Sequence, residues 1–239
     1  MITKETLEKI EKISIQIDHD ISFAGKSKGN KHLYRVVKIA SFLAEKLGAH
    51  KEIILAGAYL HDVPLSKGND SDYEKNKEII FTIVANFSIT QQEKEAIAEC
   101  VASHEGTGGL QTLESKIIHD ADVLEKTGLL GIIRHTWKLT NLESINPENI
   151  TDTEVAGILE HIKWRKNKLQ TELAKKIEKY LAIEIPKEKA KNIIVTTSRL
   201  AKQGIITEII AEKILPILDD SEKEKIIEQL DVSYLDLIS

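Results

Sequence analysis

The sequence is poor in the residues that cross-link a chain or anchor it in a membrane. It contains one cysteine, Cys100, and one methionine among 239 residues. A single cysteine excludes an internal disulfide and a thiolate-rich metal site, so we expect Cys100 to pack as a small hydrophobic residue. No apolar run approaches the roughly 20 residues that a membrane-spanning helix needs, and the first residues lack the apolar core of a signal peptide. These absences predict a cytoplasmic protein.

A surplus of basic charge is also missing. The net charge is −5 and charged residues make up 30% of the chain, with 5% aromatic residues. We therefore expect no general attraction to nucleic acid, and a phosphate-bearing partner would have to meet a local basic patch. The length suits one large helical domain, or one domain with a small appendage.

Helical periodicity dominates the sequence, and no segment alternates as a half-buried strand would. From 32 to 47, residues three or four apart form one helix face, namely His32, Val36, Ala40, Leu43 and Leu47. Gly48 is typical of a helix end. A second helix is predicted over about 50–63, ended by Pro64. Only four prolines interrupt the chain, and we predict an all-α fold.

Further segments follow the same pattern. The Gly-rich segment 103–111 predicts a loop, and residues 112–127 predict another helix. The spacing of Ser71–Glu74 and of Thr90–Glu93 fits capping boxes that open helices. One long charged helix is predicted from about Thr151 to Leu181.

Pro186 marks a predicted boundary between a core, residues 1–185, and a C-terminal helical extension, residues 186–239. In the extension we expect helices at about 187–202, at 205–218 with a break at Pro216, and at 221–230. Its isoleucines serve either its own packing or a partner-binding or dimer surface.

Four residues suggest a metal centre. His61 and Asp62 are adjacent near the predicted end of one helix, and His32 opens the helix before it. An antiparallel pair of helices would bring the start of the first close to the end of the second. Histidine nitrogen suits first-row transition metals, and carboxylate oxygen also suits Mg²⁺ and Mn²⁺. The predicted ligands are completed by Asp122.

The choice of Asp122 rests on the helix face. Asp122 lies four residues after Ile118, nearer the apolar side of its helix, whereas Asp120 faces away. A buried carboxylate needs a partner such as a metal. Two interpretations of Asp120 stay open. It either orients water or ligand side chains beside the metal, or it lies on a solvated face of the helix.

The ordered set resembles the HD-domain superfamily of metal-dependent phosphohydrolases. The stretch 32–62 is similar to the first half of an HD domain, and 113–134, with its Asp-Ala-Asp segment and Gly-x-x-Gly run ending in Arg134, is similar to a branch of small stand-alone HD hydrolases. The resemblance covers roughly 15–183. It implies an all-α bundle around a divalent ion and hydrolysis of phosphate esters or nucleoside polyphosphates. Family members often continue with Ile-Gly-Lys after His-Asp, whereas this chain has Val-Pro-Leu-Ser-Lys. Lys67 is therefore a candidate to replace the family's lysine as a phosphate contact.

The implied chemistry assigns roles to further residues. His104, beside the glycine-rich loop, is a candidate general acid or substrate contact, a ligand of a second metal, or a cap of its loop; Glu105 is expected to orient it. Arg35, Lys67 and Arg134 are candidate phosphate contacts. Lys126 is interpreted as a surface charge.

Three functions are consistent with these residues. The first is a metal-dependent phosphohydrolase that acts on a small phosphorylated compound, which we expect to be a nucleotide, with Mn, Fe, Co, Ni, Zn or Mg as the ion. The second is a catalytically silent HD scaffold that senses a nucleotide. The third is a structural helical module, and a homo-oligomer is compatible with each.

Overall fold

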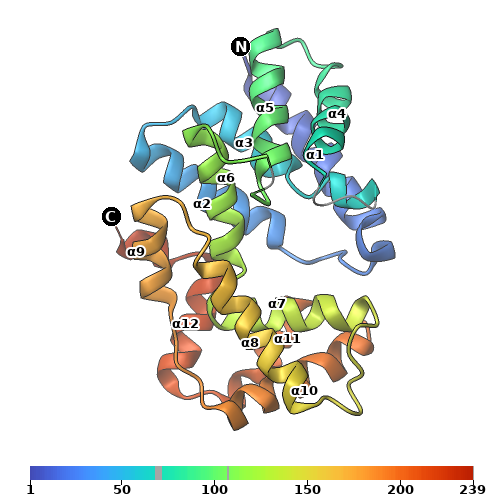
Figure 1. Ribbon diagram of the computed structural model, residues 1–239, viewed down its shortest axis with the longest axis vertical. Helices are drawn as coiled ribbons and strands as arrows, with labels where there is room; N and C mark the ends of the chain where they lie inside the picture. The colour runs from blue at the N-terminus through green and yellow to red at the C-terminus, as the bar shows by residue number, and fades with distance from the viewer. Residues whose placement is uncertain (68–71, 107, 239) are drawn as a thin grey trace. The chain divides into compact units, whose positions relative to one another are not determined.

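The computed structural model describes residues 1–67, 72–106 and 108–238, without the side chains of residues 66 and 67. All regular structure in these ranges is helical, which confirms the all-α prediction (Figure 1). The α-helices are α1 (Lys4–Asp20), α2 (His32–Leu47), α3 (Lys51–Leu60), α4 (Tyr73–Val84), α5 (Gln91–Ser103), α6 (Leu113–Glu125), α7 (Gly128–Asn141), α8 (Asp152–Lys166), α9 (Glu172–Leu181), α10 (Lys187–Lys202), α11 (Thr207–Ile214), α12 (Asp220–Asp231) and α13 (Tyr234–Leu237). Short 3₁₀ turns cover Ser22–Gly25, Pro64–Lys67 and Leu215–Ile217. No described helix is long and apolar enough to span a bilayer.

The helices form two compact units. Unit 1 comprises residues 1–28, 32–122 and 170–174, and unit 2 comprises residues 29–31, 123–169 and 175–239. The division falls inside α6, and Pro186 lies within unit 2. The assignment of residues 1–185 to one functional domain stays a prediction.

Unit 1 is built around α3, which packs against α1, α2 and α5, while α4 packs on α5. Its core includes Ile10, Leu60, Ile80, Ile97 and Val101, all fully buried. Burial of such aliphatic side chains contributes about 1.5–3 kcal/mol each. Cys100 is buried beside this core, and burial raises the pKa of its thiol to about 12. It therefore packs as the small hydrophobic residue that the sequence predicted.

Unit 2 is organised around α7, which packs against α8, α10, α11 and α12. The side chain of Gln229, on α12, holds the start of α7: its Nε2 donates to the Thr127 carbonyl, and its Oε1 accepts from the Leu130 amide. Trp137 is 5% exposed and donates from Nε1 to the Ile205 carbonyl at 3.0 Å. The C-terminal helices thus share a core with α7.

Two predicted helix boundaries are wrong. The helix predicted over 50–63 ends at Leu60, because the His61 ring takes the Ala58 carbonyl that a further turn would have used. The single helix predicted from Thr151 to Leu181 is two helices, α8 and α9. The chain breaks between them where Thr171 caps the start of α9 by accepting from the Ala174 amide.

Helix starts were predicted with mixed success. Thr90 and Glu93 form the expected capping box at α5. Ser71 lies outside the described residues, and the N-cap of α4 is Asp72, which accepts from the Lys75 amide. In the C-terminal part, α10 has its predicted bounds and Pro216 lies in the expected break. The start of α12 is capped by Asp219, which lies two residues before the predicted start at Ser221.

Candidate metal centre

Unit 1 brings together the four residues that the sequence proposed as ligands. His32 is the first residue of α2, His61 and Asp62 directly follow α3, and Asp122 lies in α6. Three of them are nearly inaccessible, and the Asp62 side chain is 24% exposed. The cluster is therefore buried on most sides, with Asp62 at its accessible edge.

The spacing of the four side chains fits one ion. His32 Nε2 lies 3.2 Å from His61 Nε2 and 3.2 Å from Asp62 Oδ2. Asp122 Oδ1 lies 3.3 Å from His32 Nε2 and 3.4 Å from His61 Nε2, and Asp62 Oδ2 lies 3.3 Å from His61 Nε2. Ligand atoms about 2.1 Å from a shared ion lie roughly 3.0–3.4 Å apart at tetrahedral or octahedral angles. His32, His61 and Asp122 therefore form a group that could hold a metal ion, and Asp62 lies within 3.3 Å of both histidine nitrogens.

The orientation of His61 prepares it as a ligand. Its Nδ1 donates to the Ala58 carbonyl at 2.8 Å, which directs the lone pair of Nε2 at the cluster. Burial lowers the pKa of His61, but the carboxylates of Asp62 and Asp122 outweigh burial and raise the pKa well above its ordinary value of 6.5. A cation is thus strongly favoured at this position.

His104 presents a second imidazole to the same region. Its Nδ1 donates to the Val101 carbonyl at 2.6 Å, and its backbone carbonyl accepts from His119 Nδ1. The Nε2 atom is buried and has no hydrogen-bond partner in the described part of the chain; Glu105 Oε1 lies 3.7 Å away. His104, Glu105 and Asp122 offer ligand atoms within 4.8 Å of one another. This atom is therefore available for a substrate, a proton or a second cation.

Asp120 is fully buried, so the solvated alternative for this residue is wrong. Its Oδ1 accepts from the Gln170 amide at 2.7 Å, and its Oδ2 accepts from the amide and the hydroxyl of Thr171 at 2.8 and 2.7 Å. Burial raises the pKa of Asp120, although these hydrogen bonds oppose the rise. The contacts join α6 to the start of α9, and a catalytic role for Asp120 stays a prediction.

The three candidate phosphate contacts lie in different settings. Arg35 is 2% exposed and is therefore a buried residue of α2. The side chain of Lys67 lies outside the described residues. Arg134 belongs to unit 2, where its Nε lies 2.8 Å from Glu125 Oε2. The proposed phosphate contacts of all three residues stay predictions.

Sequence reasoning missed the support of the loop after His104. Gly108, at φ +73°, lies against the Tyr73 ring, and a Cβ there would come within 2.5 Å of Tyr73 Cδ2. The Tyr73 hydroxyl donates to Glu99, which also pairs with Lys77 Nζ at 2.8 Å. The only sequence signal was the glycine itself, whose need for a positive φ is common in turns.

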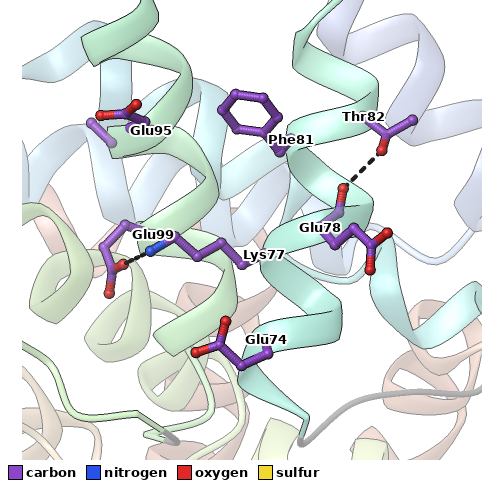
Figure 2. A pocket seen from close by; sticks show the side chains of 8 residues that line it. Glu74, Lys77, Glu78, Phe81, Thr82, Glu95 and Glu99 are labelled. Atoms are coloured by element: carbon purple, nitrogen blue, oxygen red, sulfur yellow. Dashed lines mark hydrogen bonds and ion pairs between the residues drawn. The ribbon is translucent and has the colours of Figure 1, made fainter.

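A separate hollow on unit 1 lies between α4 and α5 (Figure 2). Its volume is about 690 Å³, and it is lined by Glu74, Lys77, Glu78, Phe81, Thr82, Glu95, Ala96 and Glu99. Figure 2 shows the lysine directed at Glu99. Four carboxylates against one paired lysine make this hollow repulsive to phosphate. It includes none of the proposed ligands.

Comparison with known proteins finds a family match over the part of the chain that contains the cluster. Residues 30–127 match the model of the HD domain, a span that contains all four proposed ligands and His104. The chain is 30% identical over 94 residues to ribonuclease Y of Clostridium perfringens, a match that covers 39% of this chain and 17% of that enzyme. The chain thus spans less than a fifth of the length of these relatives.

Solved structures share the fold. Bacillus subtilis YpgQ, solved in complex with ADP, aligns with a TM-score of 0.58 at 16% identity and covers 76% of this chain and 89% of YpgQ. An HD-superfamily hydrolase of Bacillus thuringiensis aligns with a TM-score of 0.55 at 22% identity and covers 74% of this chain and 89% of that protein. The chain therefore carries an HD-domain match over residues 30–127, which contain the convergent His and Asp side chains, in a helical fold that these solved structures share.

Proposed function

We propose that this protein is a metal-dependent phosphohydrolase that cleaves a phosphate-ester or pyrophosphate bond of a nucleotide. The observation that carries the proposal is that the Nε2 atoms of His32 and His61 lie 3.2 Å apart, and that one oxygen of Asp62 and one of Asp122 each lie 3.2–3.4 Å from both nitrogens. The HD-domain match supports hydrolysis in general. The nucleotide is supported by the names of two similar proteins, a ribonuclease and a protein that binds ADP.

His32, His61, Asp62 and Asp122 would hold the ion. A divalent ion bound by these residues supplies a Lewis acid and a bound water of lowered pKa. The burial of the two histidines and Asp122 keeps bulk water from three sides of the cluster. Asp62, the most accessible of the four, marks the side from which a substrate phosphate would approach.

His104 is proposed as the residue that donates a proton to the leaving oxygen. The hydrogen bond from Nδ1 to Val101 fixes the ring, so that Nε2 is the atom that gains and gives the proton. Arg35 would add positive charge near the start of α2. If His104 and Glu105 instead bind a second ion, the protein will contain two metal ions per chain; we expect one, measured by elemental analysis after loading and desalting.

The test is release of phosphate or pyrophosphate from a panel of nucleotides with Mn²⁺. Wild type is compared with Asp62→Asn and with Asp20→Asn, which makes the same chemical change at the exposed end of α1. Release by wild type and Asp20→Asn, but not by Asp62→Asn, is the expected result. Metal-loaded wild type that hydrolyses no nucleotide but binds one in equilibrium dialysis would instead favour the nucleotide-sensing alternative.

A further inference from the structure

Unit 2 carries a cluster of aromatic rings and cations, on α7 and α8 and just beyond their ends, that the metal chemistry does not use. We name it the α7–α8 basic face; it consists of Lys126, His135, Lys138, His161, Trp164, Arg165 and Lys168. His161, Trp164 and Arg165 follow the i, i+3, i+4 spacing of one face of α8, and Lys168 lies two residues past the end of that helix. The protein has a net charge of −5, so a concentration of cations on one face is a departure from its average surface.

Two rings of this face are stacked, and a third ring, tilted by 32° against them, is exposed. His135 and His161 are parallel, with centroids 3.8 Å apart and an angle of 7°. The His161 and Trp164 rings are 5.6 Å apart. Trp164 is 51% exposed, whereas Trp137, the other tryptophan, is 5% exposed. An exposed indole at the end of a ring stack offers a flat apolar surface for a further ring.

Cations border the rings. Arg165 Nε donates to His161 Nε2 at 2.9 Å, and Lys168 Nζ lies 5.0 Å from the Trp164 ring centroid. Burial lowers the pKa of His135 to about 3, helped by the positive potential of His161, Arg165, Lys138 and Lys126. Basic residues in the last turn of a helix are explained by its dipole. The helix dipole does not account for the exposed Trp164 beside them, or for Lys126 and Lys138, which do not belong to α8.

We propose that the α7–α8 basic face binds single-stranded nucleic acid, with a base stacked on Trp164 and backbone phosphates at Arg165 and Lys168. Sequence-tolerant single-strand binding combines these two elements, aromatic rings for bases and cations for the backbone. The low net charge predicted no general nucleic-acid binding, and this face is the local basic patch that such a partner requires. The proposal does not depend on hydrolysis at the metal centre.

The test uses the full chain with Asp62→Asn, which stops hydrolysis and leaves the α7–α8 basic face unchanged. A fluorescent oligoadenylate of about 12 nucleotides, within the site sizes of single-strand binders, is titrated and its anisotropy measured. Trp164→Leu should weaken binding by about tenfold or more, and Trp164→Phe by less than about threefold, because a ring remains for stacking. Unlabelled oligoadenylate should quench tryptophan fluorescence in the parent and not in Trp164→Leu, where the buried Trp137 remains.

Charge is tested separately. Arg165→Gln with Lys168→Gln should lower the magnitude of the slope of log affinity against log salt by about 1.4, because each of the two lost phosphate contacts on a single strand contributes about 0.7. Lys202→Gln with Lys213→Gln makes the same charge change at exposed lysines of α10 and α11 and should leave the slope unchanged.

Three results would overturn the proposal. The first is that the oligonucleotide does not bind. The second is that the Arg165→Gln, Lys168→Gln variant and the Lys202→Gln, Lys213→Gln variant lower the salt slope equally. The third is that an inorganic polyphosphate binds as well as the oligonucleotide while Trp164→Leu has no effect. RNA and DNA forms of the oligonucleotide are compared, and binding of either that depends on Trp164 supports it. Loss of nucleotide hydrolysis in the earlier test would leave these outcomes unaffected.

Discussion

His61 and His104 make the same hydrogen bond at the ends of two different helices. Each directly follows a helix, and each donates from Nδ1 to the carbonyl three residues before it, Ala58 for His61 and Val101 for His104. Their rings lie 5.5 Å apart at an angle of 81°. A carbonyl in the last turn of each helix thus fixes the tautomer of each ring and leaves each Nε2 for the site. Both histidines are followed by a carboxylate, Asp62 and Glu105.

The first prediction concerns protons at the metal centre. Burial lowers the pKa of His61, but Asp62 and Asp122 raise it well above the ordinary value, so His61 carries a proton at pH 7 when no metal is bound. Because a metal ligand must be deprotonated, binding of Mn²⁺ at pH 7 should release about one proton, and the apparent affinity should rise with pH.

Calorimetric titrations in two buffers of different ionisation enthalpy count the released protons. Equal heats in the two buffers would contradict the prediction. His50→Gln, at an exposed histidine, is the control and should leave the proton count unchanged.

The second prediction separates the two aspartates of α6. Asp122→Asn should weaken metal binding by more than the roughly 10–100-fold that outer-sphere changes cost, because it alters a ligand. Asp120→Asn should keep the metal and lower the free energy of unfolding by about 1–3 kcal/mol, because a charged acceptor of three hydrogen bonds is lost. Metal titration and urea denaturation of both variants provide the measurements.

Thr171→Ala tests the same network from the other side. Its destabilisation should overlap with that of Asp120→Asn, so the double variant should be less destabilised than the sum. Additive effects, or loss of metal in Asp120→Asn alone, would show that Asp120 acts at the metal instead.

Most of the helices and the burial of Asp122 could be predicted from local signals, and the contacts between distant segments could not. Thr90 and Glu93 gave the start of α5 because a capping box is local. The apolar spacing behind Asp122 placed it on the buried face, and it is 1% exposed. By contrast, Asp120 is buried by residues 170–171, about 50 positions away, which neither periodicity nor spacing reveals.

The break between α8 and α9 was missed for the same reason. The charged, amphipathic stretch from Thr151 to Leu181 has helical periodicity throughout, and no proline or glycine interrupts it near residue 168. Its interruption depends on a tertiary contact, the hydrogen bonds from Thr171 to Asp120. Local propensity is overridden where such a contact offers the backbone other partners.

The third prediction concerns acid stability. Burial, then the neighbouring His161 and Arg165, lower the pKa of His135 from 6.5 to about 3. The unfolded chain therefore binds a proton at His135 that the folded chain does not. This contribution to stability is fully present above about pH 6.5 and is lost as the pH falls towards about 3.

Replacement of His135 by Asn should remove this sensitivity. The loss of stability between pH 7 and pH 5, measured from urea denaturation, should be about 1 kcal/mol smaller in the variant than in wild type, after allowance for partial solvent screening. His50→Gln should keep the loss seen in wild type. A loss of the same size in all three proteins would refute the assignment to His135.

The last prediction compares two helical glycines in unit 2 that differ in their surroundings. A Cβ at Gly131, in α7, would collide with the Lys126 carbonyl, a backbone atom that cannot move without shifting the chain. A Cβ at Gly157, in α8, would meet nothing within 4 Å. Gly131→Ala should therefore destabilise the fold by about 1–3 kcal/mol, as overpacked substitutions do. Gly157→Ala should stabilise it by about 0.5–1 kcal/mol, because alanine loses less backbone entropy in a helix than glycine.

Thermal denaturation should show the two midpoints moving in opposite directions from wild type, by about 2–4 °C per kcal/mol. Midpoints that move in the same direction would mean that the start of α7 is not held against Lys126 as closely as this packing requires.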